Sequence, residues 1–203
     1  MEKIFARVLS IIFHPLLVPT WFLLILFKLP FYTHLNFPTK INAMVLFFVF
    51  VMTFVLPALA ATGMWFLKLI ENLEMRQRHE RTFPMIAIAV FFYITFYLLK
   101  QLSVFQAVTI FMLGSTMLVV LGLGFNYFYK ISQHMIAWGG LTGALIALGL
   151  SLHSPFYFWL FGIIMVSGIM GFARLKTASH TPFEIYSGYL LGVLVMTGLF
   201  LYL

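Results

Sequence analysis

The chain alternates long apolar runs with short polar segments, and this pattern predicts a series of membrane-spanning helices. About 20 residues of apolar α-helix cross the hydrocarbon core of a bilayer. Seven runs have about this length, and we expect spans near residues 8–29, 41–67, 85–102, 104–128, 132–152, 155–173 and 183–203. Pro15 and Pro19 predict a kinked, shortened or re-entrant first span, and Pro57 predicts a kink in the second.

The composition supports a membrane protein. Of the 203 residues, 63% are hydrophobic and only 8% are charged, whereas soluble domains are closer to half apolar and a quarter charged. We therefore expect an all-α polytopic membrane bundle of six to seven transmembrane helices, with residues 1–203 forming a single integral-membrane domain. The first run has no clear small-x-small cleavage site, so it is predicted to be a retained span and not a signal peptide.

The inventory of ionisable residues limits the chemistry. The chain has no cysteine and no aspartate, which excludes disulfides and thiolate sites and argues against hard-cation sites built from clustered carboxylates. We expect no metal and no cofactor. The net charge is +7, but the basic residues lie at the ends of apolar runs. Anionic membrane lipid is therefore the expected partner, and nucleic acid is not.

Counting spans places the polar segments on sides of the membrane. Two predicted spans separate the 71–84 loop from Lys130, and two more separate Lys130 from Arg174, so all three segments are expected on one side. That side also receives three histidines: His79, His134 and His180. Glycines in the last three spans are expected to let these helices approach closely: Gly139, Gly140, Gly143, Gly168, Gly171, Gly188 and Gly192.

Two of the polar segments have features of anion sites. The segment from Arg76 to Pro84 contains three arginines, which offer forked donors to a phosphate but also fit an ordinary positive-inside loop. In the second segment, Ser132 is predicted to be the N-cap of the fifth span, where a helix N-terminus attracts anions. His134 follows at the membrane edge, and a capping serine with an interfacial histidine remains the alternative interpretation.

The third segment is the most informative. From residue 85 onward only five residues are charged, and three of them (Arg174, Lys176 and Glu184) surround His180. Residues 181–184 fit a capping box. His180 and Glu184 are four residues apart at a helix start, so the carboxylate could accept a hydrogen bond from one ring nitrogen and leave the other nucleophilic. Both roles are compatible. The capping role alone gives no reason for the neighbouring cations.

Together the three segments predict a site for an anionic tetrahedral group, most simply phosphate. They resemble the three motifs of the type 2 phosphatidic acid phosphatases, membrane relatives of the vanadium haloperoxidases, and are similar to a compact bacterial branch of that family. The family pattern is Lys-x6-Arg-Pro, Pro-Ser-Gly-His and Ser-Arg-x5-His-x3-Asp. The matching segments, which fall within about residues 74–192, are Arg78-His-Glu-Arg81-Thr-Phe-Pro84, Ile131-Ser132-Gln133-His134 and Ala173-Arg174-x5-His180-x3-Glu184.

The chain departs from this pattern at several positions. Glu184 stands where the family has aspartate, Ala173 where it has serine, and Gln133 where it has glycine. The lysine of the first motif has no clear match. These departures bear on rate and on substrate, and the identity of the lipid is left open.

The resemblance implies a fold with an acid phosphatase/vanadium haloperoxidase-like core and a metal-independent lipid phosphatase acting on a phosphomonoester or pyrophosphate. It implies that His180 forms a phosphohistidine, that Glu184 orients it, and that His134 protonates the leaving group. The residues implied to hold the phosphate oxygens are Arg174, Arg81, Arg78, Lys130 and Ser132, the last through nearby N–H groups.

The resemblance also implies a location in the bacterial inner membrane, although the side that the site faces is open. Nine of the twelve Lys and Arg residues fall on the motif side, which favours the cytoplasm, whereas the bacterial family usually opens its site to the periplasm. The alternative function is a non-catalytic lipid-phosphate binding or transport protein that uses the same basic pocket. An ion channel or proton-coupled carrier fits less well, because the ionisable residues gather at one edge of the spans.

Overall fold

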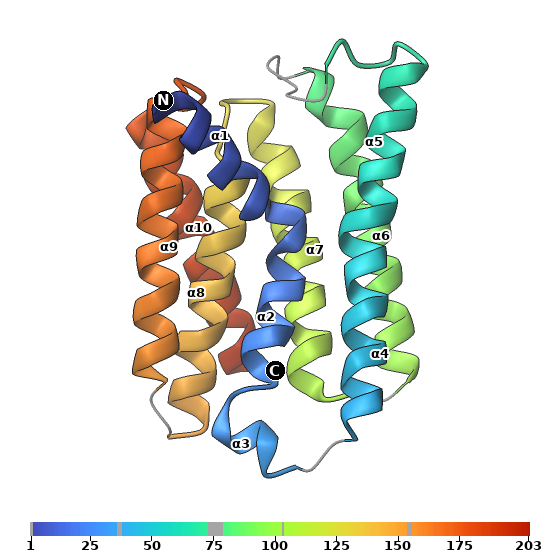
Figure 1. Cartoon of the computed structure of the whole chain (residues 1–203), viewed down its shortest axis with the longest axis vertical. Helices are drawn as coiled ribbons and strands as arrows, with labels where there is room; N and C mark the ends of the chain where they lie inside the picture. Colours follow the sequence, from blue (N-terminus) through green and yellow to red (C-terminus); the bar gives the residue numbers. More distant parts are fainter. Residues whose placement is uncertain (1, 36–37, 73–78, 103, 154–155) are drawn as a thin grey trace.

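The computed structural model of the chain describes residues 2–35, 38–72, 79–102, 104–153 and 156–203. Within these ranges the chain forms helices and turns, with no β-strand. The helical elements run side by side along the long axis of the molecule (Figure 1). In order they are α1 (Glu2–Ile12), η1 (Pro15–Leu17), α2 (Val18–Leu26), α3 (Pro30–Thr33), α4 (Thr39–Phe50), η2 (Val51–Val55), α5 (Leu56–Phe66), η3 (His79–Arg81), α6 (Thr82–Gln101), α7 (Gln106–Asn126), α8 (Gln133–Ser151), α9 (Tyr157–Lys176) and α10 (Pro182–Tyr202).

The predicted all-α polytopic bundle is confirmed. Seven helical stretches in the described ranges are long and apolar enough to cross a membrane: Val8–Leu26, Thr39–Phe66, Thr82–Gln101, Gln106–Asn126, Gln133–Ser151, Tyr157–Lys176 and Pro182–Tyr202. One boundary matters for the site. The hydrophobic pattern predicts that the sixth span ends at residue 173, but α9 continues to Lys176, which puts Arg174 on the last helical turn. The haloperoxidase-like core stays a prediction.

The first span is broken, as its prolines predict. Helix α1 ends at Ile12, His14 is extended with φ −61° and ψ 140°, and Pro15 then opens the short 3₁₀ turn η1. A proline fits the first position of a helical turn because its missing N–H would have no partner there. Helix α1 therefore leaves the line of α2 and leans across one end of the bundle, where it contacts α9 (Figure 1).

The second span is continuous but contains a wider π turn, η2, which ends two residues before Pro57. Proline removes one helical hydrogen bond and its ring crowds the preceding turn, and a π turn accommodates both. Thr53 in this turn is buried and donates its Oγ1 hydrogen to the carbonyl oxygen of Leu16, 3.2 Å away. This hydrogen bond thus joins the π turn of the second span to the 3₁₀ turn of the first span.

Helix α8 lies at the centre and makes its most extensive contact with α10. A Cβ added to Gly192 would come well within 3.0 Å of the carbonyl oxygen of Ile136, and one added to Gly139 would come equally close to the carbonyl of Tyr189. The two backbones therefore touch, as predicted for small residues in lipid. Gly168 has open space around it, so the packing role predicted for that glycine is wrong.

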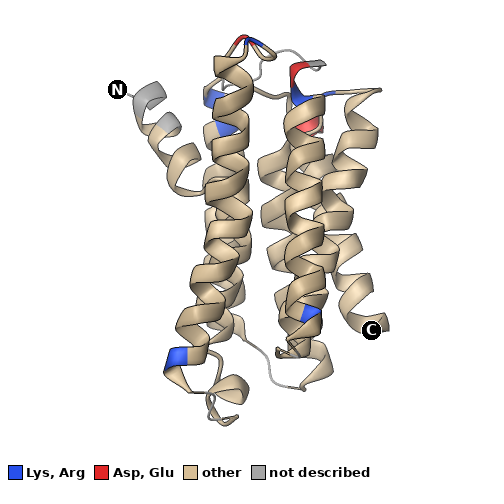
Figure 2. Cartoon of the chain, turned by 90° about the vertical axis from the view of Figure 1, so that its right-hand side faces the viewer, with Lys and Arg blue, Asp and Glu red and all other residues tan. Residues whose placement is uncertain are grey.

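Helices α8 and α10 run in the same direction, since only α9 separates them, and their N-termini therefore lie at the same end of the bundle. The amide of Ser132 donates to the carbonyl oxygen of Glu184 at 3.2 Å and joins the two helix starts. Most of the coloured Lys and Arg residues gather at this end (Figure 2). The predicted convergence of the Lys130 and Arg174 segments on one side is confirmed.

Candidate functional site

The turn between α9 and α10 presents His180. Helix α9 ends with a left-handed residue, Ala178 at φ 51°, and the amide of Ser179 returns to the carbonyl of Arg174 at 3.2 Å. Helix α10 then begins with the predicted capping box. The Glu184 amide donates to Thr181 Oγ1 at 3.4 Å, and the Thr181 amide donates to Glu184 Oε2 at 3.0 Å. His180 is therefore held between two fixed helix ends.

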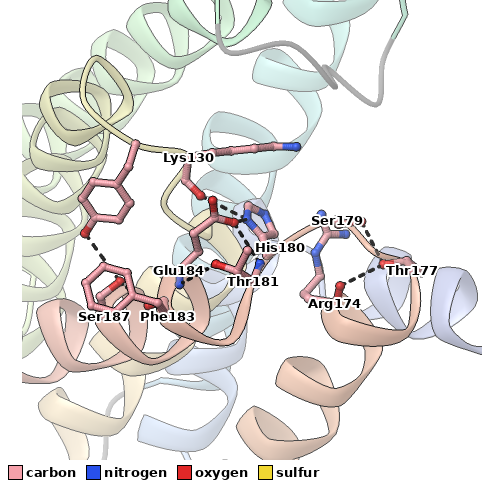
Figure 3. Close-up of polar contacts among 10 residues, drawn as sticks. Lys130, Arg174, Thr177, Ser179, His180, Thr181, Phe183, Glu184 and Ser187 are labelled. Atoms are coloured by element: carbon pink, nitrogen blue, oxygen red, sulfur yellow. Dashed lines mark hydrogen bonds and ion pairs between the residues drawn. The ribbon is translucent and has the colours of Figure 1, made fainter.

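The ring of His180 has a defined orientation (Figure 3). Its Nδ1 lies 3.0 Å from Glu184 Oε2 and 3.1 Å from the carbonyl oxygen of Lys130. A carbonyl can only accept a hydrogen bond, and a carboxylate does the same, so Nδ1 carries the hydrogen. The neutral ring then has its lone pair on Nε2. The hydrogen bond predicted between His180 and Glu184 is confirmed.

The surroundings keep this imidazole neutral. Burial, and after it the charge of Arg174, lower the pKa of His180 to about 4. The charge of Arg81 contributes to this lowering, whereas the hydrogen bond that Nδ1 donates to Glu184 opposes it. The side chain is only 2% exposed. At neutral pH the ring is therefore uncharged and its Nε2 is available as a nucleophile.

Arg81 brings a second guanidinium from the loop before α6. It is 8% exposed, and its charge interacts with both Glu184 and Glu80, which oppose the lowering of its pKa by burial. Glu80 is held in turn, because its Oε1 accepts a hydrogen bond from the amide of Glu71 at 3.0 Å. The first polar segment thus reaches the carboxylate that orients His180. Arg78 lies outside the described residues.

His134 occupies the first turn of α8. Its Nε2 lies 3.3 Å from the carbonyl oxygen of Ser10 in α1, so Nε2 carries a hydrogen and Nδ1 is the nitrogen that remains for other partners. The positive charge of Arg174 acts on His134 as well as on His180, and His180 also acts on His134. Three of the predicted site residues therefore lie within electrostatic reach of one another.

Ser132 and Lys130 both make main-chain contacts that were not predicted. Ser132 stands at the N-cap position of α8, but its side chain makes no capping hydrogen bond, and its amide serves Glu184. Its Oγ is buried without a hydrogen-bond partner among the described residues, which is unusual for a buried hydroxyl. The contact that Lys130 makes with His180 uses its main-chain carbonyl (Figure 3).

Sequence reasoning missed His14. Its ring centroid is 5.6 Å from that of His134, and the charge of Arg174 acts on it too. The hydrophobic pattern includes His14 in the first apolar span. Its side chain lies in the site because the helix is interrupted at this residue. The signal was the pair Ser10 and His14, four residues apart in an otherwise apolar run and followed by Pro15.

The fold and this cluster define a polytopic membrane protein with a basic, histidine-containing site at one end of its helical bundle. Comparison with protein-family models, with curated proteins and with solved structures found no match to the chain.

Proposed function

We propose that this protein is an integral-membrane lipid phosphatase that works through a phosphohistidine at His180. The observation that carries the proposal is the geometry of this imidazole. Its Nδ1–H is bound by Glu184 and by a main-chain carbonyl, its Nε2 carries a lone pair, and Arg174 and Arg81 act on it.

Phosphate is the anion that best fits these groups. Phosphoryl transfer requires mainly positioning and stabilisation of the charge on the phosphoryl oxygens. Two guanidinium groups offer forked donors that match such oxygens. The buried Oγ of Ser132 and the first-turn amides of α8 are further candidate donors.

The apolar surroundings favour a substrate with a lipid tail. A cavity of about 80 Å³ lies between the first span and helices α6, α7, α8 and α10. Its lining is mainly apolar and includes Pro15 and Gln133, which adjoin His14 and His134 in the sequence. A phosphate in the polar cluster and the start of an acyl or prenyl chain in this cavity would satisfy both environments.

The reaction follows from this arrangement. Nε2 of His180 attacks phosphorus, and the bond from phosphorus to the lipid oxygen breaks. His134 carries a lone pair on its other nitrogen, so it first takes a proton from the monoanionic phosphate group of the substrate and then gives this proton to the leaving alkoxide. Water then attacks the phosphohistidine and gives its proton to His134, while the bond between Nε2 and phosphorus breaks to release phosphate. The nitrogen of His134 that exchanges this proton is Nδ1, because Nε2 is bound to Ser10. Glu184 stabilises the imidazolium that forms on His180.

Loss of the acid–base group should be severe. General acid–base catalysis is typically worth about 10²–10⁴-fold, so we expect His134→Ala to lower kcat by a factor in that range while phosphate still binds. The measurement is steady-state phosphate release together with inhibition by inorganic phosphate. A substrate with a better leaving group, such as p-nitrophenyl phosphate, needs less protonation and should lose less. An equal loss on both substrates would contradict the role of His134 as the acid.

The pH profile should report the neutral state of His180. Its pKa is lowered from 6.5 to about 4, so the nucleophilic form persists below pH 6.5, and kcat/KM should fall only as the pH drops through about 4. Glu184→Gln removes the carboxylate that stabilises the protonated ring and should move this acid limb to lower pH. An acid limb at the same pH in both proteins would show that the titrating group does not contact Glu184.

The lowered pKa of His180 also makes the folded protein less stable as the pH falls. The unfolded chain binds a proton at His180 near pH 6.5 and the folded chain only near pH 4. Stability from this residue is therefore lost as the pH falls from about 6.5 towards 4. Activity should be measured within the time for which the protein stays folded at each pH.

The function itself is tested by phosphate release from a series of lipid phosphates by detergent-solubilised protein in the presence of EDTA. A single-turnover reaction quenched in base, where phosphohistidine survives, then tests for the acid-labile covalent intermediate. Turnover together with this intermediate is the expected result. Tight binding of a lipid phosphate with neither turnover nor intermediate would favour the non-catalytic binding or transport protein.

A further inference from the structure

In each imidazole of the cluster, one ring nitrogen makes a hydrogen bond within the protein. The other ring nitrogen carries a hydrogen in His14 and a lone pair in His134 and His180. The Nδ1 of His14 accepts a hydrogen bond from the amide of Leu16 at 3.3 Å. An amide can only donate, so the proton of the neutral His14 ring lies on Nε2. Across the described residues, no acceptor is bound to this Nε2–H. His134 and His180 each present a lone pair instead.

The ring of His14 is held in place. It meets the ring of His134 edge to face at 5.6 Å and the ring of Phe54, in the π turn of the second span, at 6.3 Å. The hydrogen bond from Leu16 fixes a third direction. A side chain fixed on three sides offers its remaining N–H in one direction, with little entropy left to lose when it binds a ligand.

The charge around His14 favours an anion. Arg174 acts on His14 as it does on His134 and His180, and the rings of His14 and His134 are in contact. An anion would offset this shared positive charge. A metal ion would need a different arrangement, and the described histidines and glutamates include no group of three that could hold one. An anion with several acceptor oxygens can take donors from Arg174 and His14 together.

We propose that His14 is a further catalytic residue whose Nε2–H donates a hydrogen bond to a phosphoryl oxygen of the substrate beside Arg174. The identity of the anion rests on the proposed function. The N–H is neutral and already oriented, so it meets the charge that develops on the oxygens during transfer without rearrangement. The break after α1 would then have a functional role, because it places His14, a residue of the first span, beside the other site residues.

Three substitutions separate the possible roles of His14. Gln places an N–H near the position of Nε2, Asn keeps an acceptor for the Leu16 amide two residues on, and Phe keeps a ring against His134. We expect His14→Gln to retain most of the kcat/KM on a lipid phosphate. His14→Asn and His14→Phe should lose about 10- to 100-fold, as for a hydrogen bond to a charged group.

The same variants are tested for binding of inorganic phosphate by isothermal titration calorimetry and for thermal unfolding in detergent. The expected order of affinity is the order of activity, at similar unfolding temperatures. Activity of His14→Phe equal to that of the parent would overturn the proposal. So would equal losses in all three variants, because the N–H that His14→Gln was chosen to retain would then make no difference.

The binding measurement keeps this proposal separate from the proposed phosphatase. If the parent binds phosphate, shows no turnover, and loses affinity in His14→Asn and His14→Phe but not in His14→Gln, the phosphatase is wrong and the role of His14 in holding the anion stands. Turnover by the parent that is unaffected in every His14 variant overturns the role of His14 and leaves the phosphatase in place. A parent that neither binds phosphate nor turns over a lipid phosphate overturns both.

Discussion

Replacement of His180 by alanine is expected to reduce phosphate release from a lipid phosphate by about 10⁴-fold or more, the scale on which loss of a nucleophile acts in other hydrolases. The proposed reaction requires a covalent bond between His180 and phosphorus, and no other described imidazole could replace this residue. None of the others has both a carboxylate bound to one nitrogen and a lone pair on the other. The single-turnover phosphohistidine should disappear with the activity. The measurement is phosphate release with EDTA present, together with acid-labile incorporation of phosphate.

His34→Ala is the matched control. His34 is exposed at the end of α3, at the opposite end of the bundle, and should have the activity of the parent. Because His180 is buried, the variant must also be shown to unfold at a temperature close to that of the parent. A folded His180→Ala protein that releases phosphate at the parental rate would refute the assignment of the nucleophile.

Gly192→Ala is expected to destabilise the fold and the site together. The new methyl group would overlap the carbonyl of Ile136 and the backbone of Gly139 and Gly140, none of which is a flexible side-chain end. The helices α8 and α10 must then separate, and overpacking of this kind typically costs about 1–3 kcal/mol. Because α8 carries His134 and α10 carries Glu184, activity should fall at temperatures where the protein is still folded.

Gly198→Ala is the control on the same helix. An added methyl group there meets open space, and alanine has the higher helix propensity, so stability should be unchanged or slightly raised. Thermal unfolding in detergent and phosphate release are measured on both variants. If the two substitutions had the same effect, the close approach of α8 and α10 would not be what fixes the site.

Much of the fold was predictable because the bilayer imposes it. Hydropathy places the seven spans to within a few residues, and the alternation of sides then brings Lys130 and Arg174 to one end whatever the details of packing. The capping box at Thr181 was also predictable, since a cap depends on residues three apart in sequence. It fixes the carboxylate that His180 uses.

The rest depends on contacts that the sequence does not encode locally. Gly168 and Gly192 have similar apolar neighbours, and only the rotation of each helix decides that one meets a backbone and the other open space. His14 lies in the site because the chain changes direction after α1, and the sequence does not specify that direction locally. Ser132 was correctly assigned to a helix start, but the carbonyl of Glu184 takes its amide because α10 lies alongside.

The contact between His134 and Ser10 joins residues 124 positions apart in the sequence. His180, which completes the cluster, follows later still. During biosynthesis α1 is therefore made well before α9 and α10, the hairpin that completes the cluster. A nascent chain interrupted before α10 holds Ser10 and His134 but lacks Glu184, so the proposed chemistry requires α10.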